Sequence, residues 1–138
     1  MPQSLPPKRY ILLVEDDVDD QELLKEVFHS IDTPVPELLF VNSGHSLLNF
    51  LNETKGENLP CLILMDYNMP GLNGAEILKE MLNRKGYDHI PKIIWSTSGT
   101  DTFRTTCLSL GAKDYIIKPS TVEDLKEIVK YLLTLCTK

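Results

Sequence analysis

Residues 61–66 have the sequence CLILMD, a run of apolar side chains that ends in the aspartate Asp66. Pro60 precedes the run and Asn68-Met69-Pro70-Gly71 follows it, so turn residues bound it on both sides. A short apolar run between turn signals is typical of a strand that is buried on both faces. Parallel sheets contain such strands, because helices cover both of their faces. Asp66 would then lie at the carboxyl end of a central strand.

Other short apolar runs repeat this pattern along the chain. The predicted strands are residues 10–14, 38–41, 61–65, 92–95 and 115–117. The segments around 23–31, 47–51, 75–82, 103–107 and 122–136 have apolar residues at helical spacing. The alternation predicts an α/β fold of the flavodoxin-like, doubly wound type, a (βα)5 three-layer sandwich with the parallel strand order 2-1-3-4-5. Such folds bind ligands outside the carboxyl ends of strands 1 and 3.

Length and charge narrow the class of protein. A chain of 138 residues is typical of one domain, and we expect a tail over residues 1–9 and a single domain over residues 10–138. The net charge of -6 argues against binding to nucleic acid, which needs a clustered basic face. The apolar run 10–14 is too short for a membrane span or a secretory signal. We therefore expect no membrane association and a cytoplasmic location.

The cysteines Cys61, Cys107 and Cys136 form no C-x-x-C pair and are odd in number. Such a set indicates neither a disulfide framework nor a zinc site. We therefore expect all of them to be reduced thiols.

Acidic side chains follow the first and the third predicted strand. Glu15 and Asp16 come after residues 10–14, and Asp66 comes after residues 61–65. In the predicted topology these carboxylates meet at one edge of the sheet. Like charges about 4 Å apart repel by roughly 4 kcal/mol at an effective dielectric constant near 20, so the cluster must protonate, pair with a base or hold a cation. An all-oxygen set of ligands suits Mg²⁺ first, then Mn²⁺ or Ca²⁺.

A simpler interpretation exists for part of the acidic segment. Acids at the start of a helix interact well with its dipole and its free N–H groups, and Asp17, Asp19 and Asp20 fit that role. Asp66 does not, because the helix after it is predicted to begin only near Gly74. A calcium loop of the EF-hand type is excluded, since a loop beginning at Asp17 has Glu22 at its sixth position instead of glycine.

The ends of the last two predicted strands supply complementary groups. Ser96, Thr97 and Ser98 offer hydroxyls and backbone amides, and Lys118, before Pro119, offers a positive charge. Carboxylates, a hydroxyl and an ammonium group in one pocket suit phosphoryl chemistry, in which cations neutralise the phosphoryl oxygens while a carboxylate attacks in line. Each group alone has an ordinary explanation: a solvated lysine, a strand-end hydroxyl, and a half-buried aromatic ring for Tyr115.

In this order and spacing, the motifs resemble the receiver domain of two-component response regulators, a CheY-like family. The match extends from Tyr10 to about Leu135, and its motifs are ILLVEDD (11–17), LMDYNMP (64–70) with Gly74, STS (96–98) and GAKDYIIKP (111–119). Glu15 replaces the commonest acid, Asp. Thr97 stands where a smaller residue is frequent, which would narrow access to the site. Trp95 is unusual, and we expect it to serve core packing.

The resemblance implies how phosphorylation would proceed. Asp66 would be the phosphoacceptor, assisted by Lys118 and Ser96. Mg²⁺, with Mn²⁺ as an alternative, would bind to Asp16, Asp66 and the backbone carbonyl of Asn68, and to Glu15 through water.

It also implies how the signal would be passed on. Ser96 and Tyr115 would be the switch residues, and Asn68 and Thr97 would control access to the phosphoryl group. The bond between Lys118 and Pro119 is often cis in this family, and X-Pro bonds are those in which the cis form costs little.

The implied protein is a phosphoacceptor switch and not an enzyme, although it assists its own phosphorylation and dephosphorylation. A sensor histidine kinase or a phosphotransfer protein would supply the phosphoryl group. The face formed by the fourth helix, the fifth strand and the fifth helix would contact a downstream protein. Only Thr137 and Lys138 follow the last predicted helix, so we expect a stand-alone receiver that contacts a protein or relays its phosphoryl group to another histidine.

Other classes of function compete with this interpretation. A pseudo-receiver would keep the fold and bind partners without phosphorylation. A phosphatase of the haloacid-dehalogenase type would need a second acid two residues after the nucleophile, where this chain has Asn68. A flavodoxin would present hydroxyls and amides to a phosphate after the first strand, where this chain has Glu15-Asp16-Asp17.

Overall fold

The computed structural model describes residues 9–32, 34–54, 56–97 and 99–136. The expectations for residues 1–8 of the tail and for Ser98, Thr137 and Lys138 lie outside these described residues.

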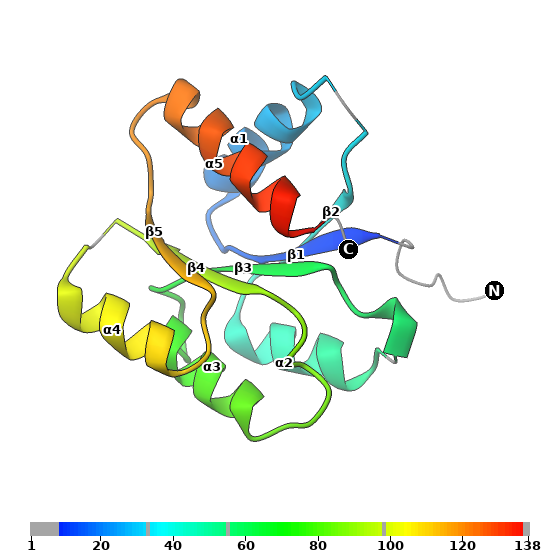
Figure 1. The fold of residues 1–138 in the computed structure, drawn as a ribbon, viewed down its shortest axis with the longest axis vertical. Coiled ribbons are helices and arrows are strands. Elements are labelled where there is room, and N and C mark those ends of the chain that lie inside the picture. The colour runs from blue at the N-terminus through cyan, green and yellow to red at the C-terminus, as the bar shows by residue number, and fades with distance from the viewer. Residues whose placement is uncertain (1–8, 33, 55, 98, 137–138) are drawn as a thin grey trace.

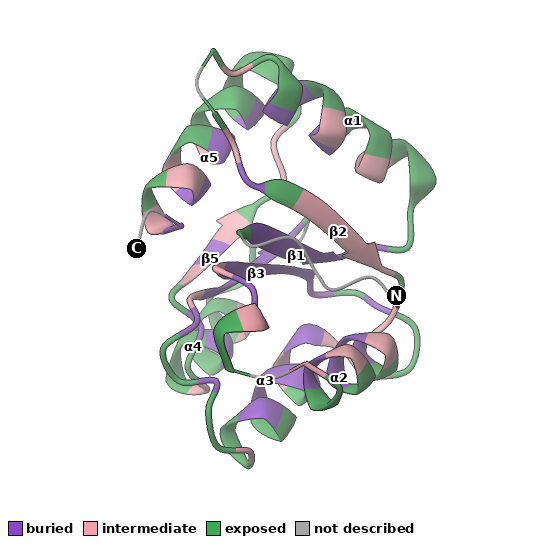
Figure 2. Cartoon of the chain, turned by 90° about the vertical axis from the view of Figure 1, so that its right-hand side faces the viewer, coloured by how far each residue is buried: buried purple, intermediate pink, exposed green. Residues whose placement is uncertain are grey.

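A five-stranded parallel sheet forms the middle layer, in the order β2-β1-β3-β4-β5 (Figure 1). Its strands are β1 (Tyr10–Val14), β2 (Glu37–Val41), β3 (Leu62–Asp66), β4 (Lys92–Ser96) and β5 (Asp114–Ile117). Every position of β1, β3 and β4 is buried, because these central strands carry apolar side chains toward helices on both sides. The edge strand β2 is only partly buried, as Figure 2 shows. The doubly wound fold and its strand order are confirmed.

Helices cover both faces of the sheet. They are α1 (Val18–His29), α2 (Gly44–Asn52), α3 (Gly74–Leu82), α4 (Asp101–Ser109) and α5 (Val122–Leu135), and a short 3-10 turn, η1, spans Gly56–Asn58. In Figure 1, α1 and α5 lie on one face and α2, α3 and α4 on the other. Alternate strand residues point to the two faces. Leu12 and Ile63, for example, pack toward the larger helical layer, and Ile11 and Leu62 toward α1 and α5.

Polar side chains fix where the helices begin. The Asp17 carboxylate accepts a hydrogen bond from the Asp20 amide at 3.1 Å, which caps α1 as the simpler interpretation of this segment predicts. Asn73 and Glu76 form a capping box, so α3 begins at Gly74 as expected. A Cβ atom at Gly74 would lie 3.2 Å from the Tyr67 Cα and from the Ile94 Cδ1. Glycine therefore lets α3 start close against the end of β3, next to Asp66.

The structure corrects the prediction about the cysteines. Cys61 and Cys136 are joined in a disulfide, with their Cα atoms 5.1 Å apart, and only Cys107 is a free, buried thiol among the described residues. Spacing rules could not find this pair, because the two cysteines are 75 residues apart and are brought together by the packing of α5 on the sheet.

The bond between Lys118 and Pro119 also differs from what the resemblance implied. The described part of the chain contains no cis peptide bond, so this bond is trans. The trans form of an X-Pro bond is favoured by only about 0.5 to 1 kcal/mol, so family membership alone does not decide the isomer.

Candidate functional site

Lys118 joins the acidic ends of β1 and β3. Its Nζ lies 2.7 Å from Asp66 Oδ2, 3.4 Å from Glu15 Oε1 and 3.4 Å from Asp20 Oδ2. These groups are 52 to 103 residues apart in sequence and meet because β1, β3 and β5 end at the same edge of the sheet. The predicted convergence of Glu15, Asp66 and Lys118 is therefore found.

Asp66 is the last residue of β3 and is only 7% exposed. One carboxylate oxygen, Oδ1, accepts a hydrogen bond from the Asn68 amide at 3.0 Å, and the other, Oδ2, contacts Lys118. The Tyr67 amide donates to the Trp95 carbonyl at 2.9 Å, which keeps the chain beside β4 as it leaves the strand. Both carboxylate oxygens therefore have fixed directions.

Glu15 is buried, at 1% exposure, and is held from two sides. Its Oε2 accepts a hydrogen bond from the Asp17 amide at 3.1 Å, and its backbone carbonyl accepts one from the Gln21 side chain. Burial raises the pKa of Glu15 to about 6, and the charges of Asp66 and Asp20 act in the same direction, whereas the Asp17 amide and Lys118 oppose them. Burial is therefore the main reason why this carboxyl group holds its proton more tightly than a free glutamate.

Lys118 is held by its backbone as well as by the acids. Its amide donates to the Ser96 carbonyl at 2.8 Å, which continues the pairing of β4 with β5. Burial by itself would lower the pKa of Lys118, but the hydrogen bond to Asp66 and the charges of Glu15, Asp66 and Asp20 outweigh it, so the pKa is raised. Lys118 is thus firmly protonated in this site.

Trp95 has a contact that the sequence did not reveal. Its ring packs in the core toward α1 and α5, as expected, and it is 4% exposed. The Lys118 ammonium also lies 5.2 Å from the centroid of this ring, which is cation–π distance. The Lys118 ammonium group therefore has an aromatic neighbour in addition to its carboxylate partners.

The two expected switch residues are both buried. Ser96, at 0% exposure, ends β4 and lies opposite Ile117 in the β4–β5 register. The Tyr115 ring, at 3% exposure, lies against the Tyr67 ring at 6.5 Å between centroids, and Tyr67 stacks on Phe103 of α4 at 4.6 Å. Tyr115 is therefore in an inward position, at the end of a row of aromatic rings that leads to α4.

The remaining predicted residues lie at the rim. Asp16, Asn68 and Thr97 are exposed, and each follows directly or closely on the end of a central strand. Asp20 is the site residue that sequence reasoning missed, because its place in the first turn of α1 suggested only a capping role. Its place in the acidic segment 15–20, directly after the first strand, was the available signal.

A divalent cation fits this donor set. Within the described residues, no three His, Cys, Asp or Glu side chains are grouped to hold a metal, and Lys118 lies among the carboxylates at this edge. Three carboxylates contact the single ammonium group, however, so two negative charges remain when all of them are ionised. Asp16 adds a further carboxylate at the same edge. Hard oxygen donors with excess negative charge are what Mg²⁺ and Mn²⁺ prefer.

Residues 11–130 match the family model described as the response regulator receiver domain. The chain belongs to this family. The response regulator Rcp1 of Synechocystis is 32% identical to this receiver domain over 131 residues, which cover 93% of this chain and 88% of Rcp1. A chemotaxis protein CheY homolog of Campylobacter jejuni is 31% identical over 116 residues, covering 84% of this chain and 88% of the homolog.

Some relatives are longer than this receiver domain. The two-component response regulator ARR7 of Arabidopsis thaliana is 28% identical over 134 residues, which are 92% of this chain but 64% of ARR7. Among solved structures, Mn(2+)-bound Rcp1 has a TM-score of 0.79 and is 30% identical in sequence. The match covers 96% of this chain and 97% of the Rcp1 chain. The phosphorylated cyanobacterial phytochrome response regulator RcpA also has a TM-score of 0.79, with 28% identity and 92% coverage of each chain.

Membership in the family carries a general function. Receiver domains are switch proteins of two-component systems and are generally not classical enzymes. The family typically binds Mg²⁺ or Mn²⁺. Over the part of the chain that the structure describes, no helix has the length and apolarity needed to cross a membrane.

Proposed function

We propose that this receiver domain accepts a phosphoryl group on Asp66 from a sensor histidine kinase or a phosphotransfer protein, in a reaction that depends on Mg²⁺. The observation that carries the proposal is the 2.7 Å contact of Asp66 with Lys118, at the edge of the sheet where Glu15 and Asp20 also meet. The excess of negative charge at this edge would attract Mg²⁺, and the ion together with Lys118 would neutralise the oxygens of the incoming phosphoryl group while the buried carboxylate attacks it.

In the transfer step, an Asp66 oxygen would attack the phosphorus of a phosphohistidine while the phosphorus–nitrogen bond breaks and the imidazole leaves. The Asn68 amide on Oδ1 keeps the carboxylate oriented, and Lys118, which now contacts Oδ2, would stay with the phosphoryl oxygens. Asp16, Asp66 and the Asn68 carbonyl would hold the Mg²⁺ ion, with Glu15 acting through water. When bound, the ion supplies positive charge that stabilises the transferring group.

Ser96 and Tyr115 would report the change. New contacts from the phosphoryl group to Ser96 and Lys118 would favour one of two existing conformations of the domain. Arg104 of α4 donates to the Tyr115 carbonyl at 2.9 Å, and this contact would couple a movement of β5 to α4. A difference of about 1 to 3 kcal/mol between the two states would shift their populations several-fold or more. The face of α4, β5 and α5 would then contact a downstream protein.

Asn68 and Thr97 would set how long the signal lasts. Both are exposed, and the Asn68 amide contacts the Asp66 carboxylate. A water must approach Asp66 in line to hydrolyse the aspartyl phosphate. The domain would therefore assist its own dephosphorylation. We also expect it to work in the cytoplasm, where sensor kinases present their phosphohistidines.

Incubation with acetyl phosphate and Mg²⁺, followed by intact mass measurement, tests the proposal. The expected result is the gain of one phosphoryl group, which is absent without Mg²⁺ and absent in Asp66→Asn. Failure to gain mass with acetyl phosphate and with a phosphorylated kinase would favour the pseudo-receiver, which signals without phosphorylation.

A further inference from the structure

Cys61 and Cys136 meet at the amino edge of the sheet, opposite the acidic site. Cys61 immediately precedes β3, and Cys136 is the residue that ends α5. Their Cα separation of 5.1 Å lies within the range that a disulfide can bridge without movement of the backbone. The bond ties the end of the last helix to the central strand whose other end carries Asp66.

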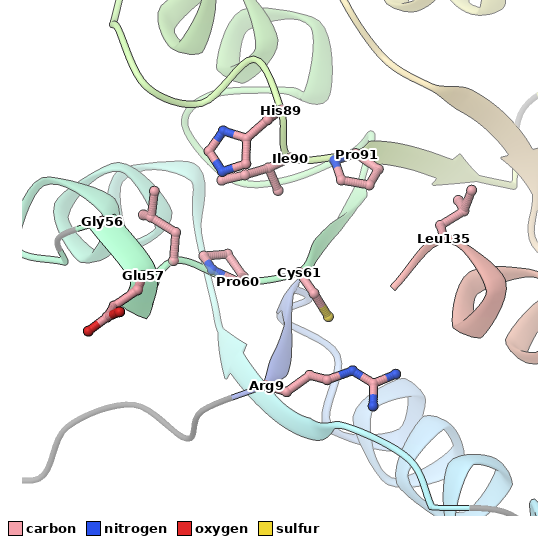
Figure 3. Close-up of a pocket in the computed structure, with 10 residues that line it drawn as sticks. Arg9, Gly56, Glu57, Pro60, Cys61, His89, Ile90, Pro91 and Leu135 are labelled. Atoms are coloured by element: carbon pink, nitrogen blue, oxygen red, sulfur yellow. The ribbon is translucent and has the colours of Figure 1, made fainter. Parts of the chain in front are cut away.

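The two sulfur atoms differ in access. Cys136 is 1% exposed and packs in the core beside α1 and α5. Cys61 is only partly buried and lines a cavity of about 340 Å³ at this edge, shown in Figure 3. A volume of this size is at the lower end of the range of small-molecule sites, about 300 to 1,000 Å³. A small reagent can therefore reach Cys61 first.

Arg9 brings a positive charge to the same place. It lines the cavity with Cys61, and its Nε donates to the Cys136 carbonyl at 3.2 Å. In Figure 3 the sulfur of Cys61 is turned toward the side on which Arg9 lies. A guanidinium group near a cysteine stabilises the thiolate, which is the reactive form, and it also binds carboxylates of an incoming molecule.

The reduced form of Cys61 also fits its surroundings. Its sulfur lies 3.2 Å from the Tyr10 carbonyl oxygen, at which a thiol can donate a weak hydrogen bond, and its amide donates to the same oxygen at 2.9 Å. The Tyr10 carbonyl therefore offers the Cys61 thiol an acceptor when the disulfide is open.

We propose that Cys61 and Cys136 form a reversible thiol–disulfide pair that responds to low-molecular-weight disulfides such as oxidised glutathione. The Cys61 thiolate attacks one sulfur of the small disulfide, forms a mixed disulfide and releases one thiol, which takes up the proton that Cys61 lost. The Cys136 thiolate then attacks the Cys61 sulfur and expels the second thiol, which takes the proton from Cys136. One small disulfide is reduced to two thiols while the two protein thiols become a disulfide.

Closing the bond would hold the end of α5 to the sheet. In the chain-entropy model, a cross-link over 75 residues restricts the unfolded chain strongly. We expect the oxidised protein to melt at least about 5 °C higher than the reduced protein. Backbone amides in the last turn of α5 should also exchange with solvent more slowly.

Glutathione buffers of graded oxidised-to-reduced ratio, with alkylation in denaturant and intact mass measurement, test the proposal. The chain has 3 cysteines, so the reduced protein should gain three alkyl groups and the oxidised protein only one, on Cys107. The change should be reversible in the folded protein. Three alkyl groups at every ratio, linkage between two chains, or reduction only after unfolding would each overturn it.

Single variants test the order of attack. Cys136→Ser should trap a stable mixed disulfide between Cys61 and glutathione, while Cys61→Ser should form little, because Cys136 is buried. Arg9→Gln should slow the first step several-fold. Cys107→Ser is the matched control, since this buried thiol of α4 lies outside the pair and its loss should leave the oxidation unchanged. Equal trapping in both cysteine variants would contradict the assignment of Cys61 as the entry thiol.

Discussion

Two lysines, one partly buried and one buried, lie at opposite edges of the same sheet, in opposite surroundings. Lys118 follows β5 at the carboxyl edge and contacts three carboxylates. Lys92 begins β4 at the amino edge, is 6% exposed, and donates to the Tyr87 carbonyl at 2.7 Å. Burial lowers the pKa of Lys92, with Asp88 opposing it only in part, whereas the pKa of Lys118 is raised because its acidic partners outweigh its burial.

The difference shows that burial of a charge does not by itself mark a functional site. Lys92 packs its aliphatic stem in the interior and finds one neutral acceptor. Lys118 balances only part of a larger negative charge. The excess of carboxylates over ammonium groups is what distinguishes the carboxyl edge, and hard cations prefer such oxygen donors.

Replacing each lysine by methionine should show the largest difference between the two edges, in the free energy of unfolding. Lys118→Met leaves buried carboxylates without their cation, and we expect the free energy of unfolding to fall by about 2 to 4 kcal/mol. Lys92→Met removes a desolvated charge and keeps the apolar stem, so the change should stay within about 1 kcal/mol. Urea unfolding in the presence of a chelator measures both. Similar losses of unfolding free energy in the two variants would contradict the difference proposed between the two lysines.

Addition of Mg²⁺ should stabilise the folded protein through the carboxyl edge alone. At a concentration ten times its dissociation constant, a ligand that binds only the folded state adds about 1.4 kcal/mol. The melting temperature should then rise by about 3 to 6 °C. Asp66→Ala should lose most of this rise, and Lys92→Met should keep it. A rise that persists in Asp66→Ala would place the ion elsewhere.

Lys92 should make a smaller contribution, which appears in how the free energy of unfolding depends on pH. Its folded-state pKa lies below the ordinary value of 10.5, so between the two values the unfolded chain binds more protons than the folded one. The free energy of unfolding therefore gains a contribution that rises with pH in this window. Comparison of the wild type with Lys92→Met in alkaline urea titrations isolates it. An unchanged slope in Lys92→Met would contradict the described environment of this lysine.

The sequence predicted the carboxyl edge well because it depends on topology. Once five βα units were recognised, the ends of β1, β3 and β5 had to lie at one edge, and Glu15, Asp66 and Lys118 followed from that. Asp20 was missed because a carboxylate in the first turn of a helix already has a sufficient local role, and only the length of the Lys118 side chain brings the two together.

The amino edge could not be predicted in the same way. The meeting of Cys61 with Cys136 depends on how far α5 extends and at what angle it packs, and neither follows from spacing along the chain. The environment of Trp95 was predicted only in part. Its position in the core was expected from its strand, but its contact with Lys118 depends on the loop after β5. Local patterns locate strand ends, whereas pairs formed by helix ends need the packed structure.

Assignment of the modified residue is the most direct test of the central claim, that the acidic edge receives its phosphoryl group on Asp66. The protein would be phosphorylated with acetyl phosphate and Mg²⁺, the acyl phosphate reduced with borohydride, and the altered residue located by peptide mass spectrometry. The modification should lie on Asp66, with Lys92→Met labelled to the same extent as the wild type. Modification of Glu15, Asp16 or Asp20 in place of Asp66 would contradict the account.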